Sequence, residues 1–149
     1  MTVFDHSLAT LRLFGDDLIP AEITALLGAS PTAAHHKGQQ LTGSQPGAVR
    51  IARTGSWRLN AARREPEDLE AQIFEILDQL TSDLAAWQSL APFRPDLFCG
   101  LFMASGNDGV SLSPRAMLAL GQRGIELGLD IYDAEEEVEP TAPPAALIS

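Results

Sequence analysis

Residues 8–28 read LATLRLFGDDLIPAEITALLG and determine the first strand and the first helix of the chain. Leu11 and Leu13 alternate with polar neighbours, which is the period of a half-buried strand. Pro20 suits the first position of a helix, and Gly28 suits the residue that ends one. We therefore expect a β-strand followed directly by a short α-helix.

The next part of the chain changes in composition. Residues 29–47 are rich in Gly, Ser, Thr, Gln and Pro, which predicts a long loop with a role in mobility or binding. Residues 49–54 and 57–61 have the character of two short strands. Gly55 and Ser56 between them fit a two-residue hairpin turn, so we expect a β-hairpin here.

A long amphipathic pattern follows the expected hairpin. Apolar residues recur at spacings of three and four from Leu69 to Trp87, the period of a helix with one buried face. The acidic residues Glu65, Glu67 and Asp68 that precede it favour a helix N-terminus. This pattern predicts one long helix that ends near Ala91, before Pro92.

The last third of the folded chain contains four expected elements. Residues 96–104 are nearly all apolar, which is typical of a strand buried on both faces. After a turn we expect a short returning strand at 110–112. A helix is expected over 113–124 and a half-buried strand over 125–132, because apolar and polar residues alternate there.

These elements follow the order β-α-β-β-α-β-β-α-β, and the first six match the order of ferredoxin-like folds. We expect an α+β fold in which a largely antiparallel sheet of about six strands carries the one long helix on one face. We expect residues 1–132 to form a single domain. Residues 133–149, acidic and then rich in Pro and Ala, should form a disordered tail.

Several short motifs occur in the same order in a known bacterial family. They are ATLRLFGDD (9–17), PT (31–32), KG (37–38), Trp57, DLFCG (96–100), SGN (105–107), LSP (112–114) and LDIY (129–132). Over residues 8–132 the chain resembles the bacterial domain of unknown function family 4279. The resemblance implies a small, soluble bacterial domain without an established activity, and it transfers no catalytic residue.

Length and composition exclude several classes of protein. The chain has 149 residues, of which 45% are hydrophobic and 20% are charged, as expected for one globular domain. It contains no apolar run of about 18 residues, so we expect no membrane span. Residues 1–7 lack the pattern of a secretory signal, and the single Cys99 cannot form an internal disulfide. We therefore expect a cytoplasmic location.

Charge is distributed unevenly along the chain. The net charge of −10 argues against nucleic-acid binding, which depends on neutralising phosphates. Residues 133–139 carry acids and no base, whereas residues 23–64 carry no acid. The acidic tail is either a solubilising appendage or a cover for the basic sector. The basic residues of this sector are His35, His36, Lys37, Arg50, Arg53, Arg58, Arg63 and Arg64.

Arg53 and Arg58 are the leading candidate binding residues. A two-residue turn at Gly55 and Ser56 would place the two arginines directly opposite each other on the solvent face. Like charges in that position destabilise a hairpin unless an anion lies between them, a nearby carboxylate such as Glu65 compensates them, or both side chains extend into water. The loop residues His35, His36 and Lys37 complete the candidate site.

Other residues with reactive side chains favour structural roles. His35 and His36 are adjacent, whereas zinc ligands on a helix are normally three or four residues apart. Asp16 and Asp17 fit turn and capping chemistry. Cys99 lies in an apolar strand that should keep its thiol protonated. We therefore expect no catalytic residue, no metal site and no cofactor.

The leading functional hypothesis is a non-catalytic module that binds a protein or a small anionic ligand, as a monomer or a homodimer. A first alternative is an immunity-like or inhibitor protein whose acidic surface covers a basic toxin or enzyme. A second alternative is an enzyme of unrecognised type. No nucleic acid and no membrane are expected as partners.

Overall fold

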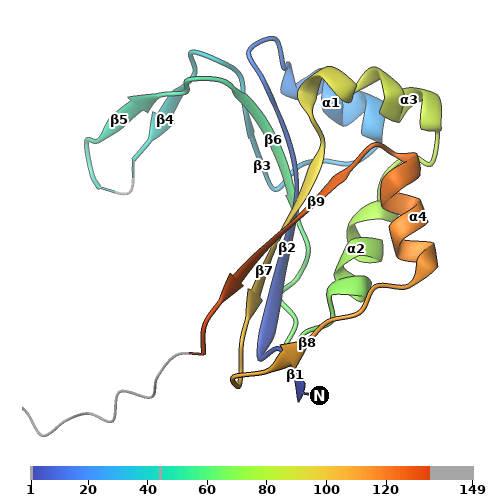
Figure 1. Ribbon diagram of the computed structural model, residues 1–149. Coiled ribbons are helices and arrows are strands. Elements are labelled where there is room, and N and C mark those ends of the chain that lie inside the picture. The colour runs from blue at the N-terminus through green and yellow to red at the C-terminus, as the bar shows by residue number, and fades with distance from the viewer. Residues whose placement is uncertain (1, 44, 135–149) are drawn as a thin grey trace, which may run out of the picture.

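The alternating run near the start of the chain forms β2, the central strand of the main sheet. The computed structural model describes residues 2–43 and 45–134. Most of the expected disordered tail, residues 135–149, lies outside the described residues. Figure 1 shows the elements, whose bounds are β1 Thr2–Val3, β2 His6–Gly15, α1 Pro20–Leu27, β3 Ala33–His35, β4 Gln40–Thr42, β5 Val49–Ile51, β6 Gly55–Asn60, α2 Leu69–Leu77, α3 Leu84–Ser89, the 3-10 helix η1 Ala91–Phe93, β7 Asp96–Phe102, β8 Asp108–Gly109, α4 Pro114–Gln122 and β9 Glu126–Tyr132.

Five strands form one mixed sheet in the order β3-β6-β2-β7-β9. Neighbours from β3 to β7 pair antiparallel, whereas β9 runs parallel to β7. The α+β class is confirmed, but the expectation of a largely antiparallel sheet is wrong. The parallel pair arises because α4 lies between β7 and β9 in the chain, and a crossover helix returns the chain to the end of the sheet where β7 begins.

The helices lie on one face of this sheet and leave the other face open (Figure 1). On the covered face, Leu11 and Leu13 of β2 and Trp57 of β6 are 0% exposed. They belong to one core cluster with Ile73 and Ile76 of α2. The sheet therefore has one face buried in the core and one face exposed to solvent, as antiparallel strand pairing allows. No helix in the described part of the chain is long and apolar enough to cross a membrane.

The expected long helix is wrong, because residues 78–83 divide it into α2 and α3. Leu80 in this link is 8% exposed and packs in the core, so the apolar spacing continues across the break. The Asp83 carboxylate accepts a hydrogen bond of 3.0 Å from the backbone N–H of Ala85. This capping bond starts a second helix and explains why the chain is not helical throughout.

The segment 29–47, expected as a loop, contains β3 and β4. β4 pairs with β5 to form a two-stranded arm, residues 40–43 and 45–51, which projects on the open side of the sheet (Figure 1). The expected hairpin turn is wrong, since Gly55 and Ser56 lie within β6. A Cβ on Gly55 would lie 2.6 Å from the Gly15 carbonyl oxygen, so this glycine permits a close approach of strands rather than a turn.

Other sequence predictions agree with the structure at the level of elements. α1, α4 and β9 form where expected, and Gly28 ends α1 with a positive φ of 87°. The prediction of a returning strand at 110–112 is wrong, because the strand in this part of the chain, β8, covers Asp108–Gly109 and ends before residue 110. β7 forms as expected but is not buried on both faces, since Phe98 is 36% exposed on the open face.

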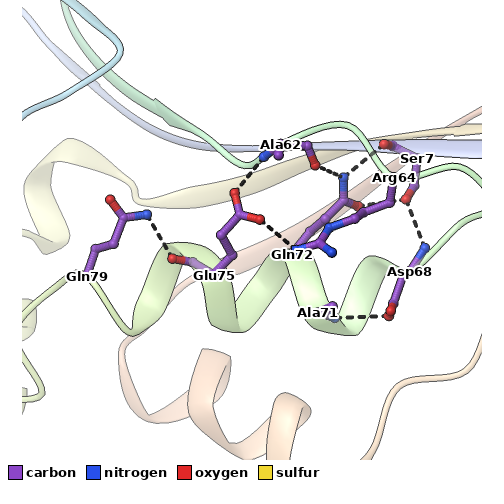
Figure 2. Close-up of polar contacts among 8 residues, drawn as sticks. All are labelled: Ser7, Ala62, Arg64, Asp68, Ala71, Gln72, Glu75 and Gln79. Atoms are coloured by element: carbon purple, nitrogen blue, oxygen red, sulfur yellow. Dashed lines mark hydrogen bonds and ion pairs between the residues drawn. The ribbon is translucent and has the colours of Figure 1, made fainter.

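A buried carboxamide, that of Gln72 in α2, joins the helix layer to the sheet (Figure 2). Its Nε2 donates to the carbonyl oxygens of Ser7 and Ala62 at 2.9 Å each, and its Oε1 accepts from Ser7 Oγ at 2.7 Å. One turn later, Glu75 accepts from the Ala62 N–H at 2.6 Å and from Arg64 at 2.8 Å. These bonds satisfy polar groups that the core would otherwise leave without water.

We expect Gln72→Leu to lower the free energy of unfolding by about 2–3 kcal/mol. The substitution keeps the volume but leaves the Ala62 carbonyl and the Ser7 hydroxyl without their buried partner. Urea denaturation measures this change. The matched control is Gln79→Leu, which removes one exposed bond to the Glu75 carbonyl and should change stability by less than about 0.5 kcal/mol. Equal effects of the two substitutions would contradict the structural role of Gln72.

Candidate functional site

A cleft of about 550 Å³ lies between the arm and the open face of the sheet. The arm and the link after it, residues 52–54, form one wall, and β2, β3 and β6 form the other. We call it the arginine cleft. It is lined by Phe14, His35, Leu41, Arg50, Ile51, Ala52, Arg53, Thr54, Ser56 and Arg58.

The register of β6 determines the position of Arg58. Arg58 lies opposite Arg12 of β2 and opposite Ala33 of β3. Two neighbouring arginines are tolerated because Arg12 binds Asp96 through two hydrogen bonds of 2.8 and 2.7 Å. These bonds raise the pKa of Arg12 and compensate its charge. The guanidinium carbons of Arg12 and Arg58 lie 5.3 and 5.5 Å from the centre of the Phe14 ring.

Arg53 lies elsewhere than the sequence predicted. It belongs to the link between β5 and β6, so it is not the cross-strand partner of Arg58, which is Arg12. Ala52, which is 5% exposed, anchors this link, and its N–H donates to the Gln39 carbonyl at 2.9 Å. The fold nevertheless brings Arg53 and Arg58 to the same cleft.

The three loop residues of the candidate site separate into two places. His35 lies at the end of β3 and lines the arginine cleft, whereas His36 and Lys37 line a different surface hollow beside α1. Lys37 Nζ donates to the Asp16 carboxylate at 3.1 Å. This bond lowers the pKa of Asp16. Lys37 therefore has a partner of its own and does not belong to the cleft.

Sequence reasoning missed Arg50 and Phe14 as members of the cleft. Arg50 falls in the acid-free stretch and alternates with Val49 and Ile51 along β5, a signal that would have assigned it to one face of a strand. Phe14 gave no signal, because only the pairing of β2 with β6 brings it beneath Arg58. Pairing between distant strands cannot be obtained from local periodicity.

The cleft is positively charged and carries no compensating acid in its lining. Within residues 2–43 and 45–134, no carboxylate lies within 4.0 Å of Arg50, Arg53 or Arg58. Guanidinium groups bind carboxylates and phosphates through paired hydrogen bonds. Such an arrangement can hold an anion, and guanidinium groups, which stay protonated, supply no general base.

A second cleft of about 620 Å³ lies at the other end of the open face. His6, Phe102 and Tyr132 stack across three strands, with ring centres 4.0 and 4.6 Å apart. His6 Nδ1 lies 2.7 Å from the Asp5 carboxylate. The described residues contain no group of three His, Cys, Asp or Glu side chains able to hold a metal ion. This cleft mixes charges and lacks the single sign of the arginine cleft.

A family model matches most of the chain. The model of a family described as "Domain of unknown function (DUF4279)" matches residues 4–134. No curated protein and no solved structure matches the chain. The sequence motifs quoted above lie within the matched residues, so the resemblance drawn from them is confirmed.

The thiol of Cys99 is the remaining reactive group, and its reactivity can be measured. Its thiol is 0% exposed, and burial raises its pKa to about 12, so it stays protonated at neutral pH and cannot act as a nucleophile. We expect iodoacetamide to modify Cys99 only as fast as the protein unfolds, at a rate that rises with urea. Rapid modification of the folded protein at pH 8 would show an accessible thiolate instead.

Proposed function

Because the chain belongs to the DUF4279 family, which is described only as a domain of unknown function, we propose a function from its own geometry: it is a non-catalytic module that binds an anionic ligand in the arginine cleft. The observation that carries this proposal is the set of three arginines around one hollow without an acid in its lining. In a chain of net charge −10, a cluster of this sign concentrates anions at one place.

The cleft is partly organised before any ligand binds. Arg58 is held over the Phe14 ring, and its Nε donates to Ser56 Oγ at 3.3 Å. Among the described residues, its other N–H groups have no hydrogen-bond partner and can bind an anion. Asp96 compensates the charge of Arg12 through two hydrogen bonds, so an added anion is directed to Arg58. Ordering a side chain in advance reduces the entropy lost on binding.

Arg50 and Arg53 approach the same hollow from the other wall. Both are exposed residues of the arm and its link, and their charges face a volume within the range of small-molecule sites. Leu41 and Ile51 add apolar surface beside them. The chemistry therefore fits a carboxylate or phosphate group attached to an apolar body, either a small molecule or acidic side chains of a partner protein.

An inhibitor role rests on a different feature, the acidic charge of the rest of the chain. In that function the acidic surface would cover a basic toxin or enzyme, with binding that weakens as salt is added. Such binding should survive the loss of Arg53 and Arg58. The two functions are therefore distinguished by the same pair of substitutions.

We expect the double substitution Arg53→Ser, Arg58→Ser to weaken anion binding by roughly tenfold or more and to change stability by less than about 0.5 kcal/mol. Two probes, pyrophosphate and a hexaglutamate peptide, are titrated by calorimetry at low and high salt. At least one should bind the unsubstituted chain, more tightly at low salt.

The matched control is Arg63→Ser, since Arg63 pairs with Glu65 at 2.7 Å and lies outside the arginine cleft. It should leave binding of the probe unchanged. Failure of both probes to bind, or equal binding by the double variant and the unsubstituted chain, would overturn the proposed function.

A further inference from the structure

The main sheet ends in two edge strands of different character, β3 and β9. β3 has only three residues, Ala33–His35, and a short strand offers little backbone to a partner. β9 runs over seven residues, Glu126–Tyr132. Its sequence, ELGLDIY, contains no Lys and no Pro, the residues that commonly protect an edge. Among residues 2–43 and 45–134, no strand other than β7 pairs with β9, so β9 presents a long edge open to pairing.

The hydrogen bonds of β9 to β7 determine which of its peptide groups are free. At the two ends of the strand, the Glu126 N–H and the Tyr132 carbonyl both bond toward the β7 side, at 3.1 and 2.9 Å. Peptide groups of successive residues in a strand point to opposite sides, so alternate residues share one direction. The N–H and C=O groups of Leu127, Leu129 and Ile131 consequently face the free edge.

The same residues carry apolar side chains that the fold leaves incompletely covered. In register, Leu129 neighbours Cys99 and Ile131 neighbours Leu101. Cys99 and Leu101 are 0% exposed, whereas Leu129 and Ile131 are 44% and 55% exposed. The core layer thus continues to the edge of the sheet and ends at side chains that are partly exposed. Burying this strip would remove apolar surface from water.

We propose that β9 pairs antiparallel with β9 of a second copy of this chain, about a two-fold axis at Leu129. Leu129 then lies opposite itself, and Leu127 lies opposite Ile131 of the other copy. Every residue whose peptide groups face the edge meets another such residue, so all these N–H and C=O groups gain partners. The exposed apolar side chains meet one another on the core side of the joined sheet.

No like charges lie directly opposite each other in this register. Glu126 lies opposite Tyr132 of the other copy, and Asp130 lies opposite Gly128, so no carboxylate directly faces another. A shift by one residue would set edge-facing peptide groups against groups that point away. An axis at Leu129 gives the register in which the whole of β9, from Glu126 to Tyr132, is paired.

Pairing at β9 does not depend on the proposed function. The arginine cleft is built from β2, β3, β6 and the arm, on the side of the sheet away from β9. Each copy keeps its own cleft when the two five-stranded sheets join. Failure of anion binding and failure of dimerisation are therefore separate results.

Sedimentation equilibrium of the full chain tests the proposal. We expect a species of twice the chain mass of 16.0 kDa. Leu129→Lys places two like charges at the axis and should raise the dimer dissociation constant by roughly tenfold or more, and Leu129→Glu should do the same. An equimolar mixture of the two variants should restore the dimer, because at a two-fold axis the lysine of one chain meets the glutamate of the other.

Val49→Lys is the matched control, since Val49 is 64% exposed on the arm, outside β9. It should remain dimeric, and circular dichroism should show all variants folded. A monomeric full chain would overturn the proposal; if deletion of residues 135–149 then produced a dimer, the chain's own segment would be the occupant of the edge. A mixture of folded variants that stays monomeric would overturn the register about Leu129.

Discussion

The helices pack on a single face of the five-stranded sheet (Figure 1), and this one-sided coverage governs the rest of the molecule. Strand residues alternate between faces, so each strand is mostly apolar on the covered side, whereas its open side carries charged, polar and aromatic side chains such as Arg12 and Phe98. Leu11, Leu13 and Trp57 follow this requirement on the buried side. The buried carboxamide of Gln72 holds α2 on that side by donating to the carbonyl oxygens of Ser7 and Ala62 (Figure 2).

The open face of the sheet carries charged side chains close to aromatic rings. Arg12 and Arg58 share the Phe14 ring, and Asp96 compensates only Arg12. The uncompensated charge therefore remains at Arg58, where the arm adds Arg50 and the link after it adds Arg53. At the opposite edge, the sheet ends in β9 with apolar side chains and peptide groups that face outward. The arginine cleft and the β9 edge differ in chemistry. Arginine side chains line the cleft, whereas the side chains at the β9 edge belong to the apolar layer of the core.

The sequence predicted local elements well where one pattern dominated. Pro20 and Gly28 located α1, and alternating residues located β2 and β9. The sequence-based prediction failed where one local pattern is compatible with two different structures. The apolar spacing through Leu80 concealed the break between α2 and α3, because a core residue in a link gives the same spacing as a helix. Gly55 suggested a turn, although it serves a close approach of two strands.

What the sequence alone determined is the α+β class, the membership of the family, the acid-free sector and the residue types of a cationic site. Each of these depends on composition or on neighbours within a few positions. Three relations follow from the packed fold alone: Arg58 lies opposite Arg12, Arg53 reaches the same hollow by way of the link after β5, and Lys37 pairs with Asp16. These relations join strands distant in the chain, and their register follows from packing on the shared core, which no local pattern encodes.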